Sequence, residues 1–221
     1  MITLTTVPVA PLLDRLFADA ESVKVPAMAA FAALPVEQRA HILSSKTEYR
    51  EIYAQLKDAA IPVSRETGLL LYMLARSAQA RTVVEFGTSF GISTLHLAAA
   101  LRDNGGGQLI TTEFEPSKAQ RARDNLTAGG LLDLVEIREG DALETLRSNL
   151  PEQIDLLLLD GAKGLYADVL ALVEGHLRPG ALIIADNADY CAEYVAKVRN
   201  PEGGYLSLPL PGDVELSMKR A

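Results

Sequence analysis

Four short apolar runs in this 221-residue chain each lead into an acidic side chain. The runs with their acids are Val83–Glu85, Leu109–Glu113, Leu156–Asp160 and Leu182–Asp186. A carboxylate beside buried apolar residues is costly unless it is hydrated, paired or bound to a cation. In an open parallel sheet the carboxyl ends of the strands border one crevice, where such folds bind ligands. These acids therefore predict a binding or active site at one edge of a parallel sheet.

From residue 81 onward, apolar runs alternate with stretches of helical composition, which predicts a doubly wound, mostly parallel, Rossmann-like α/β sheet. The final two apolar runs flank a turn at 209–213 that leaves no room for a helix, so we expect them to add a C-terminal antiparallel hairpin and complete a seven-stranded sheet. The expected strands are 82–86, 108–113, 134–138, 154–159, 181–185, 205–208 and 214–218, and the expected helices are 91–102, 116–129, 142–149, 164–177 and 189–199.

Residues 8–79 are rich in Ala, Leu, Glu, Gln and Arg, and prolines at 26, 35 and 62 divide them into pieces of helix length. Pro35 and Ser64 are typical of helix starts. We therefore predict an N-terminal helical extension over 1–60 and an α/β domain over 61–221. The extension carries more apolar surface than a short appendage can bury alone, so we expect it to pack on the domain and to contribute to a homodimer.

Charge and composition limit the classes of partner and location. The formal net charge of −8 argues against a nucleic-acid partner, because phosphate binding requires a basic face. The single cysteine, Cys191, leaves no internal disulfide, and the first residues lack the pattern of a signal peptide. No apolar run reaches the roughly 20 residues of a membrane span. We expect a cytoplasmic protein without a membrane partner.

Three segments between expected strands and helices have the composition of a ligand site. In Glu85–Thr94, two glycines permit a tight turn and close approach of a ligand to the backbone, although the spacing is not the G-x-G-x-x-G of dinucleotide-binding folds. Glu113 could accept the hydroxyl hydrogens of a ribose, or it could be a solvated acid at the end of a strand. Asp141, in Glu139–Leu143, could border an adenine or simply cap a helix.

In this order, these segments resemble the class I S-adenosylmethionine-dependent methyltransferases, and specifically the small cation-dependent O-methyltransferases that include catechol and caffeoyl-CoA O-methyltransferases. The resemblance extends from about Pro62 to the carboxyl terminus, and its most specific part is Asp160-Gly161-Ala162-Lys163 followed by Asp186-Asn187. It implies S-adenosylmethionine as cofactor and a small hydroxylated substrate. The implied cofactor contacts are Glu85, Gly87, Ser93, Glu113, Asp141, Ala142 and Asp160, the implied metal ligands are Asp160, Asp186 and Asn187, and the implied catalytic residues are Lys163 and Asp160.

The residue types support the metal site independently. Asp160, Asp186 and Asn187 offer oxygen ligands only, which suits Mg²⁺ first and also Ca²⁺ or Mn²⁺. Lys163 follows Asp160 by three residues and could take a hydroxyl proton if a nearby cation lowers its pKa. The alternatives are helix capping by strand-end acids and a surface lysine in a loop.

The function predicted from these residues is divalent-cation-dependent O-methylation of a small, catechol-like molecule. The chain has no Trp, 7 Tyr and 5 Phe, fewer large aromatics than known members place around a phenolic acceptor, so the acceptor is not identified. The candidate pocket walls are Ile61, Pro62, Tyr166, Tyr190, Cys191 and Tyr194. The alternatives are a metal-independent methyltransferase for an amine or carboxylate, an NAD-dependent oxidoreductase and a non-catalytic regulator with the same fold.

Overall fold

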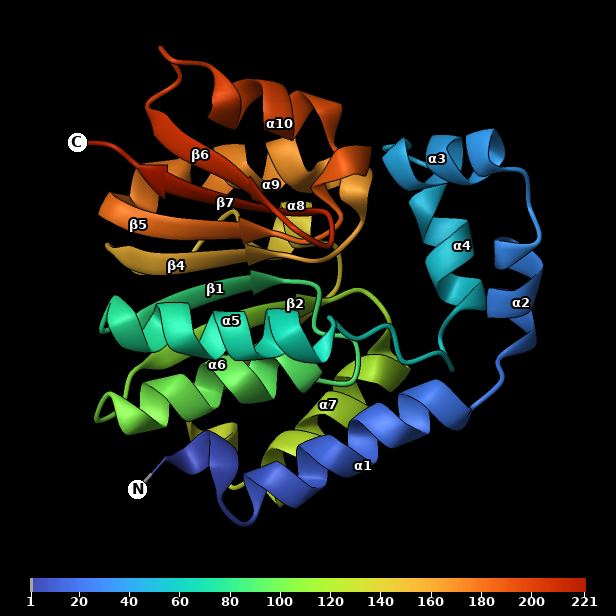
Figure 1. Ribbon diagram of the computed structural model, residues 1–221, viewed down its shortest axis with the longest axis horizontal. Helices are drawn as coiled ribbons and strands as arrows, with labels where there is room; N and C mark the ends of the chain where they lie inside the picture. The colour runs from blue at the N-terminus through green and yellow to red at the C-terminus, as the bar shows by residue number, and fades with distance from the viewer. Residues whose placement is uncertain (1) are drawn as a thin grey trace.

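Parallel strands form the centre of the computed structural model, which describes residues 2–221. The described sheet has seven strands in the order β3-β2-β1-β4-β5-β7-β6, with β6 and β7 antiparallel to their neighbours (Figure 1). This arrangement confirms the predicted doubly wound, Rossmann-like sheet with a C-terminal hairpin. The strands are β1 Thr82–Phe86, β2 Gln108–Glu113, β3 Val135–Glu139, β4 Ile154–Leu159, β5 Leu177–Ala185, β6 Tyr205–Leu210 and β7 Val214–Lys219.

Burial on both faces explains why the central strands are almost entirely apolar. Residues 156–159 of β4 are fully buried, as expected for a strand covered by helices on both sides. In the register of the sheet, Phe86 pairs with Leu159, and Leu159 pairs with Ala185. The residues that follow these strand ends therefore meet at one edge of the sheet.

Helices cover both faces of the sheet (Figure 1). One apolar core contains residues of α1, α5, α6 and α7, and the other contains residues of α8, α9 and α10. The helices of these two layers are α1 Val9–Ser22, α5 Arg65–Ser77, α6 Ile92–Asp103, α7 Pro116–Ala128, α8 Ala142–Thr145, α9 Tyr166–Val173 and α10 Ala192–Arg199. Short 3-10 turns occur at η1 Thr3–Thr5, η2 Leu132–Leu134, η3 Lys163–Leu165, η4 Glu174–His176 and η5 Ala188–Tyr190.

The first helix of the N-terminal segment belongs to the body of the molecule. Leu12 and Phe17 of α1 share a core with Leu95 of α6. The carboxylate of Asp103 holds the start of the chain in place, because it accepts hydrogen bonds from the Thr3 backbone amide at 2.9 Å and from Tyr72 Oη at 2.6 Å. Burial opposes ionisation of Asp103, but these hydrogen bonds outweigh it and lower its pKa.

The next three helices form a separate layer beyond the carboxyl ends of the parallel strands (Figure 1). We call residues 26–55 the helical arm; it consists of α2 Pro26–Ala32, α3 Val36–Ser44 and α4 Tyr49–Gln55. Neither α2 nor α3 has a buried residue, although both carry large apolar side chains. Ion pairs help to join the arm to the body, since Lys46 pairs with Asp168 and Glu193, and Arg50 pairs with Asp141.

Three predicted helices are shorter than expected. The helix predicted over 142–149 ends at Thr145, because the Arg138 guanidinium binds the carbonyl groups of Thr145, Ser148 and Asn149 and holds them out of helical geometry. The helix predicted over 189–199 begins at Ala192, after the left-handed residue Asn187 and the turn of η5.

The third correction concerns the helix predicted over 164–177 and the strand predicted to begin at 181. The α-helix covers only Tyr166–Val173, and β5 begins at Leu177. Leu177 pairs with Ile154 of β4, and the register then shifts before Leu182 pairs with Leu156. Pro179 and Gly180 lie within this shift and obscured the start of the strand, since both residues are typical of turns.

No helix among residues 2–221 is both long and apolar enough to cross a lipid bilayer. The domain division at residue 60, the homodimer and the cytoplasmic location stay predictions.

Candidate active site

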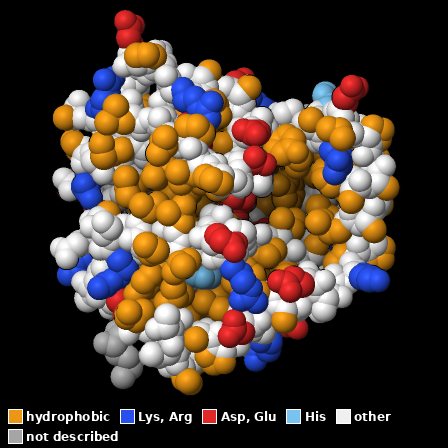
Figure 2. Space-filling model, in the orientation of Figure 1, with side chains coloured by type: hydrophobic (Ala, Val, Ile, Leu, Met, Phe, Trp, Pro, Cys, Tyr) orange, Lys and Arg blue, Asp and Glu red, His pale blue; other side chains and the backbone are white. Residues whose placement is uncertain are grey.

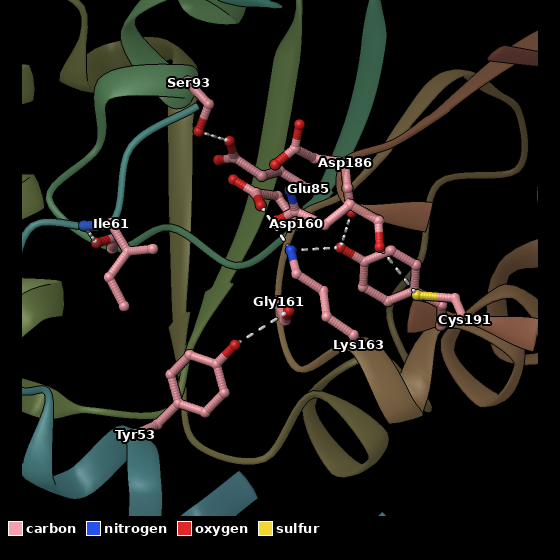
Figure 3. A network of polar contacts seen from close by, with 12 residues as sticks. Tyr53, Ile61, Glu85, Ser93, Asp160, Gly161, Lys163, Asp186 and Cys191 are labelled. Carbon is pink, nitrogen blue, oxygen red and sulfur yellow. Dashed lines mark hydrogen bonds and ion pairs between the residues drawn. The ribbon is translucent and has the colours of Figure 1, made fainter. Parts of the chain in front are cut away.

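Asp160 and Asp186 lie side by side at the carboxyl edge of the sheet (Figure 3). The Asp160 amide donates to the Phe86 carbonyl at 2.8 Å, and the Asp186 amide donates to the Leu159 carbonyl at 2.9 Å. Each acid therefore continues the hydrogen-bond ladder by one residue beyond its strand. Gly87 must be a glycine here, because its φ is +101° and a methyl group on it would lie 2.6 Å from the Asp160 carbonyl oxygen.

Lys163 joins the two acids through a chain of hydrogen bonds (Figure 3). Its Nζ donates to Asp160 Oδ1 at 3.0 Å and to Tyr166 Oη at 2.8 Å. Tyr166 Oη in turn donates to the Asp186 backbone carbonyl at 2.9 Å. Burial opposes the charged form of Lys163, but Asp160, Tyr53 and Asp186 together outweigh burial and raise the pKa of Lys163. The predicted surface-loop alternative for Lys163 is therefore wrong, since Lys163 is buried beside Asp160.

The electrostatics of the acid pair favour a bound cation. Burial raises the pKa of Asp160, with partial compensation by Lys163. Burial and the neighbouring Asp160 raise the pKa of Asp186 to about 7. Two adjacent carboxyl groups cannot both be ionised at low cost unless a cation lies between them; otherwise one of them keeps its proton. The single ammonium group of Lys163 does not neutralise both acids.

Asn187 completes the predicted oxygen-ligand set. It has a φ of 52°, a left-handed conformation that asparagine tolerates better than most residues, and it lines the same cavity as Asp160. Among residues 2–221 no group of three His, Cys, Asp or Glu side chains is placed to hold a metal. Two carboxylates with an amide oxygen nevertheless form a donor set that fits a hard divalent ion such as Mg²⁺.

Glu85 lies below this site in a fully buried position. Ser93 Oγ, Thr94 Oγ1 and Thr111 Oγ1 each donate to its carboxylate at 2.6 Å. Burial raises the pKa of Glu85 to about 7, against the effect of these hydroxyl groups. Glu85 and Ser93 thus tie the start of α6 to the sheet beneath the glycine-containing loop. Their predicted contact with a cofactor stays a prediction.

Glu113 and Asp141 lie on the wall of the cavity formed by the ends of β2 and β3. Glu113 accepts the backbone amides of Ser89 at 2.7 Å and Glu115 at 2.9 Å. Burial raises the pKa of Glu113 in spite of these bonds. Asp141 caps α8 through the Leu143 amide, so its predicted capping role is confirmed. Asp141 and Ala142 also line the cavity, which leaves the predicted adenine contact open.

The helical arm supplies cavity residues that sequence analysis missed. Tyr53 of α4 points toward the acid pair, with its Oη 3.5 Å from the Gly161 carbonyl (Figure 3). Tyr49 Oη lies 3.4 Å from Asp141 Oδ2, and Arg50 Nη2 donates to the same atom at 2.7 Å. The spacing of Tyr49, Ile52, Tyr53 and Leu56 on one helix face was the available signal, but it does not show which part of the sheet that face contacts.

The predicted pocket walls are only partly present. Ile61 and Tyr190 line the cavity. Tyr166 and Tyr194 are fully buried, so they pack beneath the site. Burial raises the pKa of the Cys191 thiol to about 12, consistent with a packing role for this residue.

Gly164 fixes the position of the arm against the body. A methyl group on Gly164 would lie 2.6 Å from the carbonyl oxygens of both Ser44 and Ser45. Gly164→Ala is therefore expected to push the end of α3 away and to lower the free energy of unfolding by about 1–3 kcal/mol. Urea denaturation measures this, and limited proteolysis at 45–48 should become faster. The control is Gly175→Ala, where a methyl group meets nothing within 4 Å; an equal effect of both substitutions would contradict the packing argument.

Comparison with known proteins shows which family this chain resembles. Residues 84–188 match the model of a methyltransferase domain. The chain is 38% identical over 131 residues to a catechol O-methyltransferase from Niastella koreensis, an alignment that covers 58% of each chain. These similarities indicate that this protein resembles the class I S-adenosylmethionine-dependent O-methyltransferases.

Two further known proteins illustrate the extent of the similarity. A catechol O-methyltransferase from Mycobacterium tuberculosis is 37% identical over 127 residues, which cover 58% of this chain and 57% of that protein. The structure of the O-methyltransferase TomG from Streptomyces achromogenes, involved in tomaymycin synthesis and solved with S-adenosylmethionine, superposes with a TM-score of 0.65 at 25% identity and covers 93% of this chain and 95% of TomG. The chain spans under three fifths of the length of the two curated relatives.

Proposed function

We propose that this protein is an S-adenosylmethionine-dependent and divalent-cation-dependent O-methyltransferase that acts on a hydroxyl group of a small, catechol-like molecule. The observation that carries the proposal is the adjacent, largely buried pair of Asp160 and Asp186, of which Asp160 lines the same cavity as Asn187 and Glu113. The catechol O-methyltransferases among its relatives support the choice of reaction.

The cofactor would occupy the side of the cavity bordered by β1, β2 and β3. Glu113 would accept hydrogen bonds from the ribose hydroxyl groups, because its carboxylate retains lone pairs beyond those used by two backbone amides. Gly87 would allow close approach to the backbone. Asp141 and Ala142 would border the adenine. S-adenosylmethionine would supply the methyl group as a sulfonium.

Asp160, Asp186 and Asn187 would hold the divalent ion. Such an ion would orient an adjacent hydroxyl group and lower its pKa. The protein itself contributes the fixed strand ends that position these ligands, together with the apolar surroundings that exclude water. Holding two reactants in a productive orientation supplies much of the acceleration in reactions of this kind.

Lys163 would take the hydroxyl proton at Nζ. In the described geometry Asp160 raises the pKa of Lys163 and keeps it protonated. Lys163 can therefore act as a base only when another cation neutralises the charge of Asp160. This requirement links the predicted base to the predicted metal ligands.

Removal of divalent ions tests the proposal. With S-adenosylmethionine and catechol as substrates, EDTA is expected to lower turnover to background, and excess Mg²⁺ is expected to restore it, because the acid pair needs a cation to bind and orient the acceptor. Methyl transfer is measured by chromatography of the methylated product, with Mg-EDTA as the control. Turnover that is indifferent to EDTA would instead support the metal-independent methyltransferase for an amine or carboxylate.

Lys163→Met is expected to lower kcat by about 10²–10⁴-fold, the usual contribution of a positioned acid–base group, with little change in binding of S-adenosylhomocysteine. The control is Lys57→Met, which removes an exposed lysine outside the cavity lining. Single-turnover rates at neutral pH measure the effect. A full rate for Lys163→Met would exclude Lys163 as the base.

A further inference from the structure

The wall of the cavity that faces the acid pair is apolar and comes from the helical arm. The cavity has a volume of about 180 Å³ and opens to solvent. Figure 2 shows it as a hollow between the sheet and the arm, bordered mainly by hydrophobic side chains. The contributing side chains of the arm and of the loop after it are Met28, Phe31, Leu43, Tyr49, Ile52, Tyr53 and Leu56.

These side chains line a chamber that the protein does not fill. Neither α2 nor α3 has a buried residue, yet Phe31 and Leu43 point into the cavity and are only half-buried. Leaving such side chains in contact with water is costly, and the cost is relieved when an apolar group covers them. The arm is held in place over this chamber by Lys46 and Arg50. An apolar part of the ligand is therefore expected to cover Phe31 and Leu43.

The charged side chains that line the cavity come from the sheet side and lie beside other polar groups, including the buried Lys118 next to Glu113. Glu113 accepts two backbone amides, Asp141 is paired with Arg50, and Lys163 is paired with Asp160. Of the residues that the structure describes, the arm contributes no charged side chain to the lining. A charged substituent held against the arm would lose its hydration without gaining a charged partner from the arm.

We propose that the acceptor is an uncharged aromatic diol that carries an apolar substituent, and that the arm binds this substituent. The inference rests on the proposed function, since the diol would bind at Asp160, Asp186 and Asn187. Its ring would pass Tyr53, which lies between the acid pair and the apolar wall. The substituent would then contact Phe31 and Leu43.

The test compares kcat/KM for catechol, 4-butylcatechol, dopamine and 3,4-dihydroxybenzoate in the presence of Mg²⁺ and S-adenosylmethionine. Burial of a four-carbon chain is worth up to about 200-fold, so we expect 4-butylcatechol to exceed catechol by about tenfold or more. We expect dopamine and 3,4-dihydroxybenzoate, which are charged at neutral pH, to be poorer than catechol. Equal or lower kcat/KM for 4-butylcatechol than for catechol would overturn the inference.

Variants test whether the preference for 4-butylcatechol over catechol depends on the arm. Phe31→Ala and Leu43→Ala should each lower the ratio of kcat/KM for 4-butylcatechol to that for catechol at least threefold. Val36→Ala, on the same helix as Leu43 but 68% exposed and outside the lining, should leave the ratio unchanged. An unchanged ratio in both Phe31→Ala and Leu43→Ala would overturn the role of the arm.

Binding measurements distinguish a failure of this inference from a failure of the proposed function. Calorimetry with the S-adenosylhomocysteine complex should show tighter binding of 4-butylcatechol than of catechol, whether or not either is methylated. Tighter binding without any turnover would support the apolar wall and overturn the proposed function. Turnover of catechol without a preference for 4-butylcatechol would support the proposed function and overturn the inference.

Discussion

Asp186→Ala is expected to lower methyl transfer by about a hundredfold or more while the protein still binds S-adenosylhomocysteine. Asp186 is one of two adjacent acids at the sheet edge, and it is 9% exposed. Its removal would leave Asp160 paired with Lys163 and would weaken any site for a divalent ion. An ion that stabilises developing charge is worth several kcal/mol, and each 1.36 kcal/mol changes a rate tenfold. Steady-state kinetics at saturating Mg²⁺ measure the loss, and calorimetry measures cofactor binding.

Asp189→Ala is the matched control for this prediction. Asp189 lies three residues further along the chain in η5, and its side chain is exposed. Its replacement is expected to leave both turnover and cofactor binding within about twofold of the parent protein. If Asp186→Ala retained turnover at the level of Asp189→Ala, Asp186 would have no role as a metal ligand.

Glu113→Ala is expected to weaken cofactor binding more than turnover, the reverse of Asp186→Ala. The dissociation constant of S-adenosylhomocysteine should rise by about 10–150-fold, because hydrogen bonds to a charged group contribute about 1.5–3 kcal/mol. The loss includes the carboxylate that orders the loop at Ser89, since Glu113 accepts its amide at 2.7 Å. Calorimetric titration measures the constant, and turnover at saturating cofactor should fall much less than binding.

Glu139→Ala provides the control for Glu113. The two acids pair in register across β2 and β3, but Glu139 is exposed and does not line the cavity. It is bonded instead to Arg123. Glu139→Ala should leave cofactor binding unchanged. If Glu113→Ala also left the dissociation constant of S-adenosylhomocysteine unchanged, a ribose contact by Glu113 would be excluded.

Because the chain has few large aromatic residues, its sequence did not identify the acceptor. The structure suggests how an acceptor could be bound without them. The wall opposite the acid pair includes Phe31, Leu43, Ile52 and Leu56, and Tyr53 Oη lies 3.5 Å from the carbonyl oxygen of Gly161. Aliphatic side chains can cover an apolar substituent without the ring stacking that a Trp would supply. The acceptor chamber can therefore be apolar in a chain that has no Trp.

The sequence by itself determined the sheet and the meeting of the acids. Apolar runs such as Leu156–Leu159 predict buried parallel strands, and the ends of such strands converge whatever connects them. Asp160 and Asp186 could therefore be predicted to lie together, and Asp141 could be predicted to cap a helix, because both statements depend on local pattern and on the general geometry of parallel sheets.

Only the tertiary structure decided where α8 ends and what faces the acids. Arg138 ends the helix at Thr145 through side-chain bonds to carbonyl groups, which helical periodicity does not record. The contact of Tyr49 with Asp141 joins residues 92 positions apart. The arm takes its place through such contacts, and neither α2 nor α3 has a buried face whose pattern could have indicated it. Local sequence specifies an amphipathic helix and its caps, but the surface that the helix covers is fixed by partners distant in the chain.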